Sequence, residues 1–199
     1  MSKPELEILI EEYVSKLLRE IFDGIPDELN VYDFDDTLCR TEGMVHVINN
    51  VTGETKDLHP HEFHEYHLQE GEEFDLSDFG VIINPETLPH LERMKADYDR
   101  LGPYGVSICT ARPSATEVIK FMADCGMPDI EIVAVGTLEP HGDVGNLNAL
   151  RKQSYLRGKL EQRNLKVLRF FDDNELNIEA AQHLQKEFPN VHMEIELVK

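Results

Sequence analysis

Three aspartates lie within four residues of one another in the segment VYDFDDTLCRT, residues 31–41. Asp33, Asp35 and Asp36 directly follow a short apolar run, so they stand at the end of a predicted strand. Carboxylates this close repel one another, and each loses hydration when it is even partly buried. The cluster therefore predicts a site for a cation, and magnesium, which prefers oxygen ligands, fits best.

The spacing of Asp33 and Asp35 suits a division of labour, because alternate residues of an extended chain point to the same side. One carboxylate can attack a phosphorus atom while the other passes a proton to the leaving oxygen. Both need the cation, since an anionic nucleophile is otherwise repelled by an anionic phosphate. We expect Asp33, the backbone carbonyl of Asp35, and Asp172 to bind that ion. Asp173 would be a further ligand or an acceptor beside it.

Groups that could bind a phosphate follow other predicted strands. Thr110 ends a strand, and its hydroxyl can bind a phosphoryl oxygen together with the backbone N–H of Ala111. A phosphoryl-transfer transition state spreads charge over three oxygens, so a basic residue is also needed. Lys152, near the start of a predicted helix, is the first candidate. Lys159, two turns further along the same helix face, is the second.

The order of predicted elements indicates how these residues are positioned. Strands are predicted over residues 29–34, 106–109, 130–135, 167–171 and 191–198, and helices over 86–100, 114–125, 148–162 and 178–188. Ser114 is expected to cap the second helix and Gly126 to end it. This alternation predicts an α/β fold with a doubly wound, Rossmann-like, mostly parallel sheet of about five strands. Ligands bind such sheets at the carboxyl ends of the strands, where the candidate residues fall.

Two segments lie outside this alternation. Residues 1–28 contain a predicted amphipathic helix over 4–22, and residues 29–38 with 86–199 form the predicted core domain. Residues 39–85 are interpreted as a small cap insertion. Within it we expect a hairpin over 45–58 with its turn at 49–53, a short helix over 59–66, and an acidic loop over 69–78.

In the order of its motifs the chain resembles the haloacid dehalogenase (HAD) superfamily of phosphohydrolases, from residue 29 onward. The matching segments are DFDDTL at 33–38, ICTARP at 108–113, a lysine near Lys152, and FFDDNELN at 170–177. The whole chain is similar to small phosphatase-like proteins of bacteriophages. The resemblance implies Asp33 as nucleophile, Asp35 as acid and base, Thr110 and Lys152 as phosphate ligands, and a cap between the first two motifs. It also implies that Asp172 and Asp173 lie at a magnesium ion.

Charge and composition limit the partners. The formal net charge is −20, with 19 Lys and Arg against 39 Asp and Glu, which disfavours nucleic acid and anionic membranes. A phosphorylated small molecule is compatible with this charge, because a bound cation inverts the sign locally. No apolar run is long enough for a membrane span, and Cys39, Cys109 and Cys125 are interpreted as reduced thiols of a cytoplasmic protein. The sequence does not predict the oligomeric state.

The expected function is a magnesium-dependent phosphomonoesterase acting through an aspartyl phosphate on a small metabolite or nucleotide. Three alternatives stay open. A 3′-phosphatase in nucleic-acid end repair is suggested by a fold-level similarity to the phosphatase half of polynucleotide kinase-phosphatase, and by the basic residues within 151–166. A receiver-like phosphoacceptor or a non-catalytic phosphate-binding protein would use similar residues. In a receiver domain, however, the acidic pair comes before the phosphoacceptor in the sequence, whereas here the candidate acceptor Asp33 lies in the first acidic cluster. Apart from these functions, a zinc site could form on the histidines of the insertion, which are His59, His61, His64 and His67.

Overall fold

The computed structural model describes residues 24–59, 62, 66–75, 77–78, 81–136 and 144–199. The helix predicted over residues 4–22 lies outside the described residues, and so does most of the short helix predicted over 59–66. No helix in the described part of the chain is long and apolar enough to cross a membrane.

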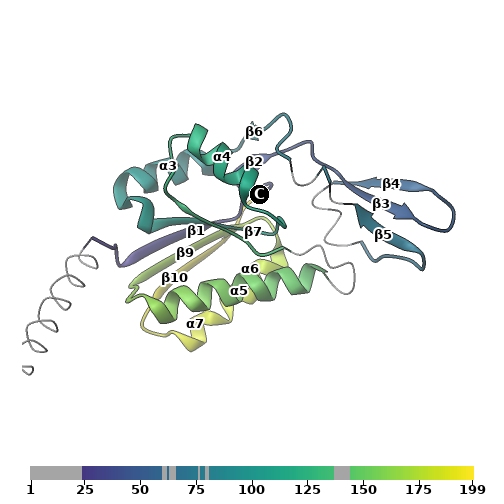
Figure 1. Cartoon of the computed structure of the whole chain (residues 1–199). Coiled ribbons are helices and arrows are strands. Elements are labelled where there is room, and N and C mark those ends of the chain that lie inside the picture. The colour runs from purple at the N-terminus through teal and green to yellow at the C-terminus, as the bar shows by residue number, and fades with distance from the viewer. Residues whose placement is uncertain (1–23, 60–61, 63–65, 76, 79–80, 137–143) are drawn as a thin grey trace, which may run out of the picture.

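A five-stranded parallel sheet forms the centre of the molecule (Figure 1). Its strands in spatial order are β10 (His192–Leu197), β9 (Val167–Asp172), β1 (Glu28–Tyr32), β7 (Val106–Thr110) and β8 (Glu131–Ala134). Every neighbouring pair is parallel, as predicted, and Val31 aligns with Ser107 on one side and Phe170 on the other. The chain moves outward from β1 to β8 and then returns to β9 on the other side of β1. The switch point of the strand order therefore lies between β1 and β9.

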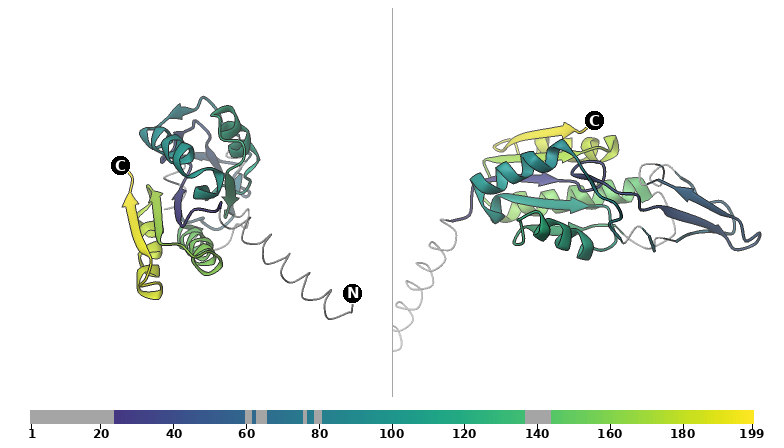
Figure 2. Two further views of the ribbon diagram at one scale, coloured as in Figure 1. Left: turned by 90° about the vertical axis from the view of Figure 1, so that its left-hand side faces the viewer. Right: turned by 90° about the horizontal axis from the view of Figure 1, so that it is seen from above.

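Helices cover both faces of this sheet (Figures 1 and 2). One face carries α3 (Pro89–Leu101) and α4 (Thr116–Asp124), with a 3₁₀ turn at Pro103–Gly105. The other face carries α5 (Val144–Gln162), α6 (Glu175–Gln182) and α7 (Leu184–Glu187). The architecture is thus α/β, with a parallel sheet between two helical layers, and is consistent with a Rossmann-like fold.

The apolar pattern of β1 explains why the sheet is buried on both sides. Leu29 and Val31 belong to the core cluster that contains residues of α5, α6 and α7. Tyr32 and Phe34 belong to the cluster that contains Leu91 of α3 and residues of α4. A central parallel strand is covered on both faces, and residues 29–32 of β1 are accordingly all buried. β1 ends at Tyr32, and the next residue, Asp33, is the first residue of the candidate site.

The insertion leaves and re-enters the core through two adjacent segments. β2 (Cys39–Arg40) pairs antiparallel with β6 (Glu86–Thr87), and the Glu42 N–H donates to the Ile83 carbonyl at 3.1 Å. Beyond this connection β3 (Val45–Asn49), β4 (Thr55–Leu58) and β5 (Glu72–Asp75) form a separate antiparallel sheet in the order β4-β3-β5. This sheet extends past the carboxyl ends of the core strands (Figures 1 and 2).

The predicted hairpin is confirmed, but the predicted acidic loop over 69–78 is wrong. Asn49 accepts hydrogen bonds from the N–H groups of Val51 and Thr52, and Gly53 adopts a φ of 74°. Glu72–Asp75 pairs with β3, which places Phe74 opposite Val47. Phe74 also packs against the small cluster of Val45, Val47 and Leu58. A strand with one apolar residue shows almost no alternation of apolar and polar residues, so the sequence did not predict β5, which forms by pairing with the open edge of β3.

Several helix boundaries differ from the predictions for local reasons. Residues 86–87 pair with β2, so α3 begins instead at Pro89, where proline is well tolerated. Asn174 caps α6, which therefore starts before residue 178, and the helix is interrupted at His183. Ser114 accepts a hydrogen bond from the Thr116 N–H at 3.3 Å, one position before the N-cap. Gly126, with a φ of 89°, follows α4 as predicted.

Candidate active site

Three predicted carboxylates converge at the switch point between β1 and β9. Asp33 follows β1, and its N–H donates to the Phe171 carbonyl on β9 at 2.8 Å. Asp172 ends β9 and Asp173 comes next. One carboxylate oxygen from each of the three aspartates lies within 4.8 Å of the others. Asp33 is 5% exposed and Asp172 is fully buried, so this cluster is part of the core rather than an acidic surface turn.

Lys152 of α5 lies between two of these carboxylates. Its Nζ donates to Asp33 Oδ1 and to Asp172 Oδ2, each at 2.7 Å, and the lysine is only 1% exposed. Lys159, the second candidate, instead pairs with Glu131 on β8 at 2.6 Å. The geometry therefore favours Lys152 as the lysine of the site.

Burial and charge determine the protonation of this cluster. Burial raises the pKa of the Asp33 carboxyl well above its usual range, and the neighbouring carboxylates raise it further against the opposing ammonium of Lys152. Burial alone would lower the pKa of Lys152, but Asp172 and Asp33 outweigh it and raise that pKa. Burial, and then Asp172, raise the pKa of Asp173 to about 7, with a smaller contribution from Asp36. The lysine is thus a fixed positive charge, and the raised pKa values of Asp33 and Asp173 mean that these two carboxyls take up a proton more readily than exposed ones do.

Asp172 is oriented by two asparagines to which the sequence analysis gave no role. Asn177 Nδ2 donates to Asp172 Oδ1 at 2.8 Å, and the Asn174 N–H donates to the same oxygen at 3.0 Å. Asn174 also accepts from the Leu176 N–H and so caps α6. One oxygen of Asp172 is therefore held by the start of α6 while the other meets Lys152. The signal was present in FFDDNELN, where the asparagine after the acidic pair is a preferred N-cap residue.

Asp35 is held by a buried arginine. Arg112 Nε donates to Asp35 Oδ2 at 2.9 Å and Arg112 Nη2 donates to Asp35 Oδ1 at 2.7 Å, and Arg112 is 1% exposed. Nη2 also donates to the hydroxyl oxygen of Thr41 at 3.3 Å. A two-point contact of this kind fixes both the position and the plane of the carboxylate. The side chain of Asp35 is not one of the three clustered carboxylates.

Thr110 and Ala111 lie where β7 ends, beside the turn that holds Arg112. Thr110 is fully buried, and its Oγ1 accepts from the Arg112 N–H at 3.2 Å, which leaves the hydroxyl proton able to point elsewhere. Gly136 closes over this turn, and its N–H donates to the Arg112 carbonyl at 3.2 Å. A Cβ at Gly136 would lie 1.9 Å from the Ala111 oxygen. The sequence analysis did not identify Gly136, since its role depends on a close approach between two loops.

Two buried polar atoms near these elements have no hydrogen-bond partner among the described residues. They are Thr37 Oγ1, within the first motif, and Asn148 Oδ1, one helical turn before Lys152 on α5. Asn148 is 2% exposed. A buried acceptor of this kind costs free energy unless a ligand or water satisfies it. The sequence analysis placed Thr37 in the first motif without a role of its own, and it did not mark Asn148, because an asparagine inside a helix has no distinctive pattern.

The carboxylates of Asp33, Asp172 and Asp173 suit a hard divalent cation. Magnesium takes oxygen ligands and keeps several waters, so a few carboxylate oxygens from one side are an appropriate set. Among the described residues, this trio is the group of His, Cys, Asp and Glu side chains that could hold a metal ion. His61 and His64 of the zinc alternative lie outside the described residues.

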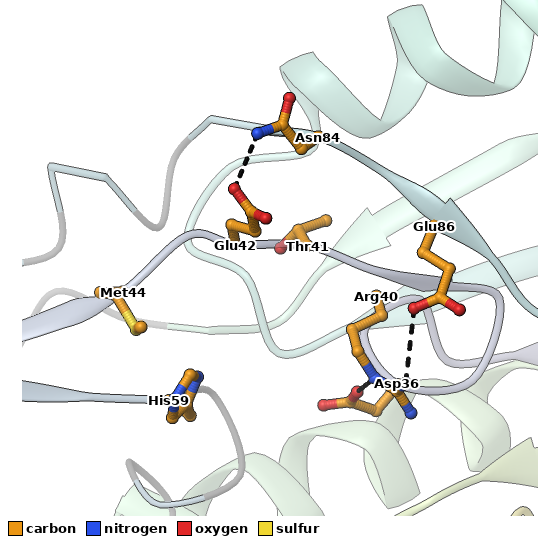
Figure 3. A pocket seen from close by; sticks show the side chains of 8 residues that line it. All are labelled: Asp36, Arg40, Thr41, Glu42, Met44, His59, Asn84 and Glu86. Atoms are coloured by element: carbon orange, nitrogen blue, oxygen red, sulfur yellow. Dashed lines mark hydrogen bonds and ion pairs between the residues drawn. The ribbon is translucent and has the colours of Figure 1, made fainter.

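A cavity of about 730 Å³ lies where the insertion joins the core (Figure 3). Its lining comes from the first motif, from both connecting segments and from the ends of β3 and β4. The lining residues are Asp36, Arg40, Thr41, Glu42, Met44, His59, Asn84 and Glu86. Asp36 adopts a φ of 55°, and Arg40 donates to its Oδ1 at 3.1 Å.

Comparison of the chain with protein-family models, curated proteins and solved structures found no match.

Proposed function

We propose that this protein is a magnesium-dependent phosphomonoester hydrolase of the HAD type, which acts through an aspartyl-phosphate intermediate. One observation carries the proposal: Asp33, Asp172 and Asp173 meet Lys152 at the switch point of a parallel sheet. An acidic turn needed only for solubility would not be buried around an ammonium group. The order of the motifs and the position of the insertion support the same family.

The residues can divide the reaction into two displacements. Asp33 attacks the phosphorus atom, the bond from phosphorus to the ester oxygen breaks, and Asp35 gives a proton to the departing alcohol. Water then attacks the phosphorus of the aspartyl phosphate while Asp35 accepts its proton. The products are inorganic phosphate and the original Asp33 carboxylate.

The other groups have positioning and electrostatic roles in this scheme. Arg112 fixes Asp35, and one oxygen of Asp35 must leave the guanidinium for the acid step. The hydroxyl of Thr110, the N–H of Ala111 and the ammonium of Lys152 would bind the phosphoryl oxygens. Asp33, Asp172 and Asp173 would hold the magnesium ion, which neutralises negative charge at the reacting phosphate when bound.

The ion pairs along α5 favour a small substrate over a nucleic acid. The end-repair alternative depended on the basic residues of segment 151–166. Arg157 pairs with Glu187, Lys159 with Glu131, and Lys166 with Asp27. Arg151 and Arg163 donate to backbone carbonyls, and Lys152 lies inside the site. These contacts support a small substrate, because each of these basic side chains already has a carboxylate or carbonyl partner.

The proposal is tested by phosphate release from a panel of phosphorylated metabolites, mononucleotides and a 3′-phosphorylated oligonucleotide, each with and without magnesium. We expect magnesium-dependent release and a preference for the small monoesters at near-physiological salt. An oligonucleotide that is favoured about tenfold in kcat/KM would support end repair instead. Stable phosphorylation of Asp33 without turnover would indicate the receiver-like alternative.

A further inference from the structure

We propose that the cavity in Figure 3 binds the alcohol part of the substrate and selects alcohols that carry hydroxyl or amino groups but no negative charge. The preferred substrates would be monophosphates of uncharged polyols, sugars or nucleosides, or of amino alcohols. Bisphosphates and phosphorylated carboxylic acids would be rejected. This inference rests on the proposed function and adds the chemical class of the substrate to it.

The position of the cavity links it to the leaving group. Asp36 lines the cavity and directly follows Asp35, the proposed proton donor to the leaving alcohol. Thr41 lines it too, and its hydroxyl contacts the same nitrogen of Arg112 that binds Asp35. A phosphate at Asp33 would therefore have its ester oxygen directed toward Asp35, and the rest of the alcohol would enter the cavity.

The size of the cavity fits an alcohol of several carbon atoms. Its volume of about 730 Å³ falls in the range of roughly 300–1,000 Å³ that is usual for small-molecule sites. Met44 and His59 flank the pairing of β3 with β4 and supply a less polar wall (Figure 3). The cavity thus offers both a surface for a carbon skeleton and polar groups around it.

The charge of the lining explains the proposed selectivity. Among the described lining residues, three carry carboxylates, Asp36, Glu42 and Glu86, and one carries a guanidinium, Arg40. Arg40 is already shared between Asp36, at 3.1 Å, and Glu86, at 3.5 Å. The lining therefore carries an excess of negative charge, and a second phosphate or a carboxylate on the substrate would be repelled.

The hydrogen-bonding groups of the lining are mainly acceptors. Glu42 accepts from Asn84 Nδ2 at 2.7 Å, which orients the amide and leaves its carbonyl oxygen available for another donor (Figure 3). Carboxylate oxygens likewise accept and do not donate at neutral pH. Hydroxyl and amino groups on the alcohol are the complementary donors, so such an alcohol would satisfy this lining.

Matched substrate pairs test the inference. The pairs are glycerol 3-phosphate with 3-phosphoglycerate, glucose 1-phosphate with glucose 1,6-bisphosphate, and a nucleoside 5′-monophosphate with its 3′,5′-bisphosphate. Each pair differs by one added anionic group. We expect the wild-type protein to favour the less charged member by at least about tenfold in kcat/KM. Equal rates within each pair, or a preference for the anionic member, would overturn the inference.

A variant that removes two negative charges from the lining provides a second test of the inference. In the double variant Glu42→Gln/Glu86→Gln, we expect the preference to fall by about tenfold, because the shape is kept and two charges are lost. Glu161→Gln, an exposed position near the end of α5, is the matched control and should keep the wild-type preference. An unchanged preference in the double variant would also overturn the inference. Hydrolysis of p-nitrophenyl phosphate separates the selectivity of the cavity from the proposed phosphatase function. Magnesium-dependent hydrolysis of this substrate without any preference within the substrate pairs would reject only the role of the cavity. The absence of magnesium-dependent hydrolysis would reject the proposed function.

Discussion

The ammonium nitrogen of Lys152 lies 2.7 Å from Oδ1 of Asp33, and both side chains are buried. Removing the charge in Lys152→Met leaves buried carboxylates without compensation, so we expect a loss of about 3–5 kcal/mol in the free energy of unfolding without divalent cations. Adding Asp33→Asn to the Lys152→Met variant should restore part of the lost stability, because one of the buried carboxylates is then removed. Denaturant unfolding of both variants measures these changes.

Lys159→Met is the matched control for that prediction. Lys159 belongs to the same helix, but its partner Glu131 is half-exposed, so the expected loss is at most about 1 kcal/mol. If the two lysine variants are equally stable, the buried charge cluster does not contribute as described.

The contact between Arg112 and Asp35 predicts a specific effect on turnover. Arg112→Lys keeps the charge but loses the two-point contact, so Asp35 is no longer fixed for proton transfer. We expect kcat to fall at least about tenfold, with a smaller change in KM. Arg157→Lys is the control, since Arg157 forms the same two-point contact with Glu187 on the surface. Comparable losses in both variants would show that the effect is structural.

The raised pKa of Asp173 makes stability depend on pH. In the unfolded chain this carboxyl loses its proton near 3.8, whereas in the folded protein it keeps the proton until about pH 7. The folded state therefore binds more protons between these values, and stability falls as the pH rises through them. The Asp173→Asn variant has no titratable group at this position and is therefore the reference protein.

The stability of the wild type relative to Asp173→Asn should consequently decrease from pH 5 to pH 8 in the absence of divalent cations. Urea unfolding of both proteins at several pH values measures this difference. Magnesium should raise the wild-type melting temperature more at pH 8 than at pH 5, because a cation competes with the protons. A difference that does not vary with pH would contradict the assignment.

Gly136 tests the loop that positions Thr110 and Arg112. A Cβ at this position would lie 1.9 Å from the Ala111 oxygen, so Gly136→Ala must displace that backbone. We expect a loss of about 1–3 kcal/mol in stability together with lower turnover. Gly158→Ala, in the C-terminal part of α5, would place its Cβ 3.9 Å from the side chain of Gln162, an ordinary contact, and should be stabilising by about 0.5–1 kcal/mol. Thermal unfolding and phosphate release of both variants make the comparison, and a fully active Gly136→Ala would contradict the role of the close approach.

The sequence predicted the core sheet because each strand is a short apolar segment, and a helical pattern separates it from the next strand. The same signal placed Asp33, Thr110 and Asp172 together, since parallel strands share one carboxyl edge. Lys152 and Lys159 are two turns apart on one helix face and could not be distinguished by spacing. Only the packing of α5 against the sheet places the first at the site and the second beside Glu131.

Other features depend on contacts that no local pattern contains. The pairing of Arg112 with Asp35 joins residues 77 positions apart, and neither local motif indicates the other as its partner. The strand at Glu72–Asp75 exists because β3 offers an unpaired edge, although the segment itself is mostly acidic. Gly136 is required only because two loops approach closely. Tertiary structure, not local propensity, determines all three.

Asp33→Asn tests the central claim most directly. The amide is nearly isosteric with the carboxylate but cannot attack phosphorus, so the variant should release phosphate from p-nitrophenyl phosphate at below about 1% of the wild-type rate with magnesium present. Thermal unfolding measured in parallel should show a cooperative transition, which confirms that the fold persists. A folded Asp33→Asn protein that keeps more than about 5% of the wild-type rate would contradict Asp33 as the nucleophile and, with it, the aspartyl-phosphate mechanism.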